Sequence, residues 1–173
     1  RQMCIRDRDI VRMAKAYGFE LIRVITNGIR FSDQDFCRQA LEAGVTFVTV
    51  SIHSPTAEIE ARITGNKKAF DQKIQAIRNV VQFMGPVWKQ WRQGFGLTTN
   101  TVITPLNLPY LEDLIHLLDQ EQSANINLIY PWIGLQESVP MEKIAVRFGE
   151  LKPILRRLLD LKSTLGTHLA LTN

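Results

Sequence analysis

Short apolar runs rich in β-branched residues alternate along the chain with longer stretches in which apolar residues recur at helical spacing. The clearest run begins at Val45 and ends near His53, where Ser54 and Pro55 interrupt it and favour the start of a helix. Runs of the same kind predict further strands at residues 21–26, 96–104 and 125–130. Strands that alternate with helices in this way are typical of a parallel sheet with the helices outside.

The stretches between these runs have the periodicity of amphipathic helices. It is clearest at residues 69–83, where Phe70, Ile74 and Ile77 fall on one face. Other helices are predicted at residues 9–17, 32–43, 55–62, after 107, and at 141–165. We expect Ser32 and Asn107 to cap their helices, Pro55 to occupy a first helical position and Pro153 to kink or split the last helix. Residues 169–173 look like the beginning of another strand.

Polar residues follow the predicted strands at their carboxyl ends, which is where parallel α/β sheets and barrels build ligand sites. The candidates are Thr26, Asn27, Ser51, His53, Asn100 and Thr101. Asn100 and Thr101 are neighbours in a strand, so only one of them faces the interior, and we expect it to be Asn100. A competing interpretation is that Thr26 and Asn27 form a turn in which Asn bonds its own backbone.

Composition narrows the classes of function. The 173 residues, 45% hydrophobic and 22% charged, suit one soluble globular domain. The net charge of +4 is mild and the basic residues are dispersed, so neither a nucleic-acid partner nor a membrane surface is expected. No run nears the roughly 18 apolar residues of a membrane span, and nothing resembles a signal peptide, so we expect a cytoplasmic protein. Cys4 and Cys37 fit no zinc or disulfide pattern, and no metal ligand is expected within the chain.

The order of several motifs resembles the middle of a radical S-adenosylmethionine (SAM) enzyme. These are Val-Ile-Thr-Asn-Gly28, the stretch from Ala43 to Pro55, Arg62-Ile-Thr-Gly65, the stretch from Asn100 to Asn107, and Ile126-Asn-Leu-Ile-Tyr-Pro131. The resemblance covers nearly the whole chain from Asp9 onward.

This resemblance implies a partial (β/α)6 TIM-like barrel, of which the four predicted strands are the third to the sixth. The first two strands would be missing, together with the Cys-x-x-x-Cys-x-x-Cys loop that holds a [4Fe-4S] cluster and the Gly-Gly-Glu that holds the methionine amino group. We therefore expect residues 1–173 to be a single partial core domain, truncated at both ends, with the cluster ligands outside the chain. Residues 1–8 resemble the translated remnant of a sequencing adapter, and residues 84–95 resemble an irregular insertion.

The resemblance also suggests which residues bind the cofactor. SAM presents an amino group, a carboxylate, ribose hydroxyls and an adenine edge, which short donors and acceptors at strand ends can bind. The predicted cofactor-binding residues are Thr26, Asn27, Ser51, His53, Arg62 and Asn100. Arg62 is the candidate for the carboxylate, because a guanidinium group can bind it with two hydrogen bonds. Relatives often carry Asp where this chain has His53, and neutral imidazole does not replace a carboxylate acceptor.

By the same resemblance, the intact protein is an enzyme that reductively cleaves SAM at a [4Fe-4S] cluster and abstracts a substrate hydrogen. Its electron donor would be a flavodoxin or ferredoxin, its substrate an unidentified small molecule or peptide, and the present chain alone would be inactive. One alternative is another (β/α)-barrel enzyme of the aldolase or phosphate-binding type, which would need a strand-end lysine or a glycine-rich loop. The other is a non-catalytic half-barrel that serves as a binding module.

Overall fold

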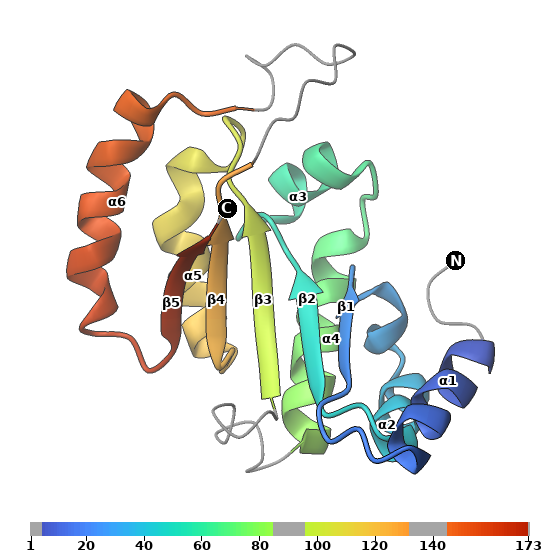
Figure 1. The fold of residues 1–173 in the computed structure, drawn as a ribbon. Helices are drawn as coiled ribbons and strands as arrows, with labels where there is room; N and C mark the ends of the chain where they lie inside the picture. Colours follow the sequence, from blue (N-terminus) through green and yellow to red (C-terminus); the bar gives the residue numbers. More distant parts are fainter. Residues whose placement is uncertain (1–4, 85–95, 132–144, 173) are drawn as a thin grey trace, which may run out of the picture.

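Five parallel strands form one sheet in the computed structural model, which describes residues 5–84, 96–131 and 145–172 (Figure 1). Their order in the sheet is their order in the chain: β1 (Arg23–Thr26), β2 (Phe47–Ser51), β3 (Gly96–Val102), β4 (Asn125–Ile129) and β5 (His168–Thr172). All four predicted strands are present, and the run at the end of the chain forms a fifth. The expected four strands, assigned to positions three to six of a six-stranded barrel, therefore do not account for β5. The prediction of an α/β fold with parallel strands is confirmed.

Helices cover one face of this sheet (Figure 1). They are α2 (Gln34–Ala43), α4 (Ala69–Met84), α5 (Leu111–Gln120) and α6 (Phe148–Lys162), with α1 (Ile5–Ala16) against α2 and α3 (Ala57–Thr64) against α4. Two short 3-10 helices, η1 (Ile29–Ser32) and η3 (Leu108–Tyr110), precede α2 and α5. None of the helices in the described ranges has the length and hydropathy needed to span a bilayer.

The core lies between the sheet and these helices, and strand alternation decides which residues enter it. In β2, Val48 and Val50 are fully buried there, and Leu97 and Ile126 occupy the same layer from β3 and β4. Residues of the opposite parity lie on the other face of the sheet. At its amino end, the Arg23 guanidinium covers the Phe47 ring, with its Cζ 4.3 Å from the ring centroid.

Two predicted helix starts were wrong by one or two residues. Asp33, not Ser32, caps α2, because its Oδ1 accepts the Phe36 N–H at 2.9 Å. Ser32 instead ends η1, where its hydroxyl donates to the Ile29 carbonyl. Similarly, Pro55 precedes the cap of α3, and Thr56 is the residue whose side chain accepts the Ile59 N–H.

Pro153 does not split the last helix. Helix α6 runs unbroken through it from Phe148 to Lys162. Proline there removes the N–H that would bond the Gly149 carbonyl, which belongs to the first turn, so the later hydrogen bonds of the helix are unaffected. The predicted insertion at 84–95 lies outside the described residues except for Met84, which ends α4.

Candidate functional site

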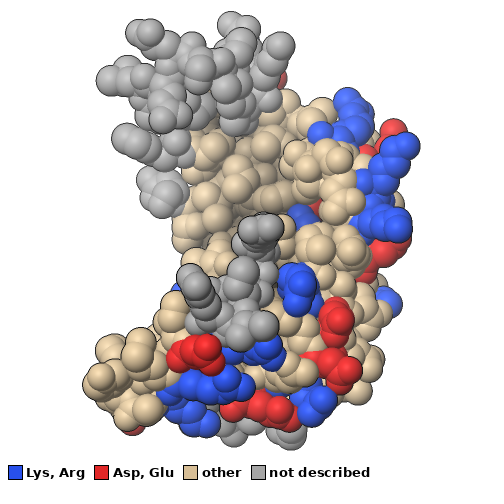
Figure 2. All heavy atoms as spheres, turned by 90° about the vertical axis from the view of Figure 1, so that its right-hand side faces the viewer, with Lys and Arg blue, Asp and Glu red and all other residues tan. Residues whose placement is uncertain are grey.

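Two rows of polar side chains cross the face of the sheet that lies opposite the helices. Strand register places Ser51 beside Asn100 and Asn100 beside Asn127. One step toward the amino ends, the second row contains Thr49, Thr98, Asn125 and His168. In Figure 2, which views the molecule from the β1 side, the surface is hollowed and the hollow is lined mainly by residues other than Lys, Arg, Asp and Glu.

Hydrogen bonds join the amides of these rows. Asn127 Nδ2 donates to Asn100 Oδ1 at 3.1 Å, and Asn125 Nδ2 donates to Asn127 Oδ1 at 3.0 Å. The Asn125 Oδ1 lies 2.8 Å from Nδ1 of His168. Beside this chain, Thr49 is only 2% exposed and its hydroxyl has no hydrogen-bond partner among the described residues.

The predicted pair Thr26 and Asn27 shapes a turn. Thr26 Oγ1 accepts the Gly28 N–H at 3.1 Å, and Asn27 Oδ1 accepts the Ile29 N–H at 3.1 Å. Gly28 has φ 83°, and a Cβ there would lie 3.0 Å from Val50 Cγ1. A residue without a side chain is therefore required where this turn packs against β2.

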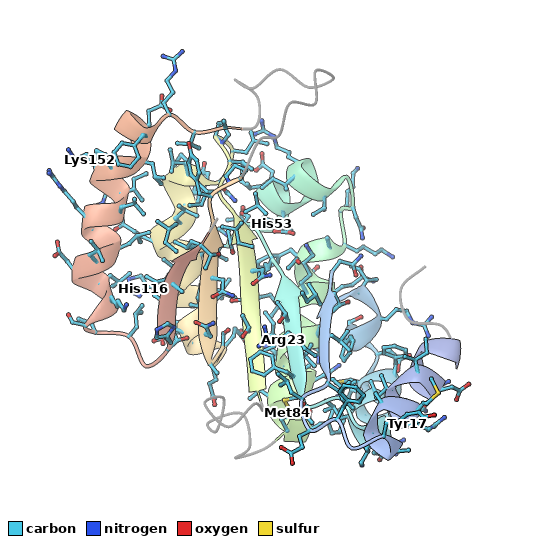
Figure 3. All side chains as sticks on the ribbon, in the orientation of Figure 1. Tyr17, Arg23, His53, Met84, His116 and Lys152 are labelled. Carbon is cyan, nitrogen blue, oxygen red and sulfur yellow. The ribbon has the colours of Figure 1, made fainter. Side chains whose placement is uncertain are left out.

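His53 lies just beyond the end of β2, near the carboxyl end of β3 (Figure 3). Its ring Nδ1 accepts the backbone N–H of Val102 at 3.3 Å. The backbone N–H of His53 donates to Glu60 Oε2 at 2.8 Å. Burial, the largest effect, lowers the pKa of His53; the Glu60 carboxylate raises it and the Lys73 ammonium lowers it, with a net decrease. The imidazole is therefore neutral at pH 7, with Nδ1 as acceptor and the proton on Nε2.

A buried ion pair supports this corner of the sheet. Glu60 of α3 is 0% exposed and Lys73 of α4 is 2% exposed, with Oε1 and Nζ 2.5 Å apart. Because Glu60 Oε2 also holds the His53 N–H, one carboxylate joins two helices to the end of β2. Sequence reasoning missed both residues, since a charged residue on an amphipathic helix usually faces solvent.

Asn107 connects the ends of β2 and β3 rather than capping a helix. Its Nδ2 donates to the carbonyls of His53 and Val102 at 2.9 and 2.8 Å, and its Oδ1 accepts the Thr104 N–H at 2.8 Å. The expected capping hydrogen bond is absent. The Thr104 hydroxyl also donates to Oδ1, at 3.2 Å, so four hydrogen bonds satisfy a side chain that is fully buried.

The structure brings only some of the predicted site residues together. Ser51 and Asn100 are register partners on the polar face, and His53 lies two residues beyond the end of β2. Thr101 has the opposite parity and is buried, with its hydroxyl donating to the Ile52 carbonyl. Arg62 is exposed on α3 and has no hydrogen bond or ion pair with any described residue. Sequence reasoning passed over Asn125 and Asn127, although their alternation in a strand could have indicated them.

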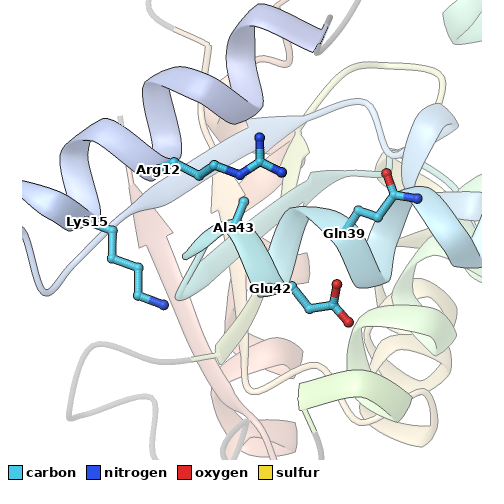
Figure 4. Close-up of a pocket in the computed structure, with 5 residues that line it drawn as sticks. All are labelled: Arg12, Lys15, Gln39, Glu42 and Ala43. Carbon is cyan, nitrogen blue, oxygen red and sulfur yellow. The ribbon is translucent and has the colours of Figure 1, made fainter.

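A separate pocket lies between α1 and α2 on the helical side (Figure 4). Its volume is about 270 Å³, and its lining consists of Arg12, Lys15, Gln39, Glu42 and Ala43. It shares no residue with the polar face, so we do not assign it to the site.

Comparison with known proteins adds a relative. No family model matches the chain. The chain is 27% identical over 166 residues to an AdoMet-dependent heme synthase of Oleidesulfovibrio alaskensis. The matched residues make up 95% of the chain and 39% of that relative. This similarity supports a relationship to radical SAM enzymes. The chain spans about two-fifths of the relative's length.

The described residues fit SAM but not an iron–sulfur cluster. Ser51, Asn100 and the unpartnered Thr49 hydroxyl offer the short hydrogen-bonding groups that the polar parts of SAM require. Among the described residues, by contrast, no three His, Cys, Asp or Glu side chains are grouped to hold a metal. Burial raises the pKa of Cys37 to about 12, so it is a neutral thiol in the core and not a thiolate ligand.

The buried pair predicts a specific pattern of stability. Lys73→Met leaves the Glu60 carboxylate buried without its partner, so we expect the free energy of unfolding to fall by about 3–5 kcal/mol. Adding Glu60→Gln removes that charge and keeps an oxygen for the His53 N–H, so the double variant should recover much of the loss. Urea unfolding followed by circular dichroism measures both. A double variant no more stable than Lys73→Met would contradict this account of the pair.

The lowered pKa of His53 predicts a pH dependence of stability. Below about 6.5, the ordinary histidine pKa, the unfolded chain takes up a proton that the folded imidazole does not, so stability falls as pH drops toward the folded pKa. His53→Asn keeps an acceptor near Val102 and cannot titrate, so its loss of stability between pH 7.5 and 5.5 should be smaller than in the wild type. His116→Asn, on the exposed face of α5, is the matched control. Equal pH dependence in wild type and His53→Asn would show that His53 is not the titrating group.

Proposed function

We propose that the intact protein is a radical SAM enzyme, and that this sheet is an arc of a partial (β/α)6 barrel that binds SAM at its carboxyl edge. The observation that carries the proposal is the register pair Ser51 and Asn100, two hydrogen-bonding side chains on the face opposite the helices, near the carboxyl ends of β2 and β3. The similarity to an AdoMet-dependent heme synthase along 95% of the chain supports it.

In this proposal the residues of the chain bind and orient the cofactor. Ser51 and Asn100 contact its polar groups, and the turn at Thr26 and Asn27 forms the neighbouring edge of the pocket. His53 offers its Nε2–H as a donor, because its Nδ1 is already used by Val102. Where relatives often have the carboxylate acceptor of Asp, this chain thus has a donor, His53. Arg62 would reach the methionine carboxylate from α3.

SAM supplies, when bound, the radical that removes a hydrogen atom from the substrate. The [4Fe-4S] cluster and its cysteine ligands would come from outside the described residues, with electrons from a flavodoxin or ferredoxin. We further propose a cytoplasmic location and a small-molecule or peptide substrate.

The alternatives have less support from the site. An aldolase-type barrel would use a strand-end lysine, but none of the five described strands contains lysine, and buried Lys73 lies on a helix with its ammonium bound to Glu60. A non-catalytic binding module would not need hydrogen-bonding side chains such as Ser51 and Asn100 arranged to bind SAM.

Equilibrium binding of SAM to the full-length protein tests the proposal. Ser51→Ala removes one hydrogen bond to the ligand, so we expect SAM to bind about 5–10-fold more weakly by isothermal titration calorimetry. Ser163→Ala, at the exposed end of α6, is the matched control and should bind like the wild type. A wild-type protein that fails to bind SAM, or Ser51→Ala with unchanged affinity, would contradict the proposal.

A further inference from the structure

The amide chain on the polar face has a direction. Asn125 donates to Asn127, and Asn127 donates to Asn100, each from Nδ2 to Oδ1. Since the Asn125 oxygen is an acceptor, the His168 Nδ1 at 2.8 Å must carry a proton and donate to it. Every bond therefore runs in the same sense, from His168 on β5 through the two asparagines of β4 to Asn100 on β3.

This direction determines which group of Asn100, the last amide of the hydrogen-bonded row, is available to a ligand. The Asn100 oxygen is turned toward Asn127 and accepts one hydrogen bond there, so the side of the amide that is turned toward Ser51 is the Nδ2 group with its two hydrogens. Hydrogen bonds linked in series polarise one another, which strengthens the terminal donor. The hydroxyl of Thr49, two residues before Ser51 on the same face, has no hydrogen-bond partner in the part of the chain that the structure describes, and so it is a second group that a ligand can satisfy.

Resting on the proposed function, we infer that the Asn100 amide is a dedicated donor to an acceptor oxygen of SAM, either carboxylate or ribose, and never faces the ammonium group. We further infer that Asn127, Asn125 and His168 are positioning residues, which fix the polarity of Asn100 without touching the ligand. An amide free to rotate would accept or donate with equal ease, so the chain determines which part of the ligand is recognised.

Asn127→Asp tests this inference by replacing the Nδ2 donor of residue 127 with an acceptor oxygen, which reverses the hydrogen bond between residues 127 and 100. Aspartate has nearly the same shape but cannot donate, so Asn100 must turn its Nδ2 toward residue 127 and present its oxygen to the ligand. We expect SAM to bind at least about tenfold more weakly by calorimetry with the full-length protein. In an Asn100→Ala background the same substitution should have little further effect, because Asn100 is the group through which it acts. An equal loss in both backgrounds would overturn the inference.

Two fragments of the cofactor identify the acceptor oxygen. Methionine carries the carboxylate without the ribose, and 5′-methylthioadenosine carries the ribose without the carboxylate. If Asn127→Asp weakens the binding of methionine but not of methylthioadenosine, the acceptor is the carboxylate. If it weakens the binding of methylthioadenosine but not of methionine, the acceptor is the ribose. Unchanged binding of SAM and both fragments overturns the inference while leaving the proposed function intact.

A measurement without ligand separates the two proposals. In protein labelled with ¹⁵N-histidine, the ring shifts of His168 should show the proton on Nδ1. In protein labelled with ¹⁵N-asparagine, the Asn100 side-chain signal, identified by its loss in Asn100→Ala, should shift in Asn127→Asp as its Nδ2 gains a carboxylate partner. An unprotonated Nδ1 in His168 would mean that the chain runs the other way and would overturn the inference even if SAM binds. Correct NMR signatures with no SAM binding would instead reject the proposed function.

Discussion

The parallel register of the five strands is the constraint on which the rest of the molecule depends. Because successive side chains alternate between faces, one register places Val48, Val50 and Leu97 against the helices and Ser51 and Asn100 on the opposite face. Shifting β3 by one residue would exchange Asn100 for buried Thr101 and place apolar side chains such as Leu97 on the face opposite the helices. The core and the polar rows are therefore two consequences of the same pairing.

Buried polar contacts then hold the strand ends in place. Glu60 ties α3 to Lys73 of α4 and to the backbone of His53, while Asn107 ties that same residue to the end of β3. A buried charge or amide without partners would be strongly unfavourable, so these contacts specify one arrangement of the loops that follow β2 and β3. The site thus rests on groups that do not themselves face the ligand.

The sequence was informative wherever the determining interaction was local. Apolar runs located every strand, alternation separated Asn100 and Thr101 onto opposite faces, and the Asn27 turn was among the competing interpretations. Contacts between distant residues could not be predicted in this way. Asn107 resembles a helix cap until its bonds to His53 and Val102 are seen, and Glu60 resembles a solvent-facing residue until Lys73 is found beside it. The role of Asn127 depends on strand register, which periodicity alone does not give.

Hydrogen–deuterium exchange of the full-length protein, with and without SAM, tests most directly whether the cofactor lies at the carboxyl ends of β2 and β3. Binding there should slow exchange in the backbone at residues 51–54 and 100–107 and leave α1 and α6 unchanged. Slower exchange confined to α1 and α2, around the pocket in Figure 4, or no change at the two strand ends despite saturating SAM, would contradict the assignment of the site.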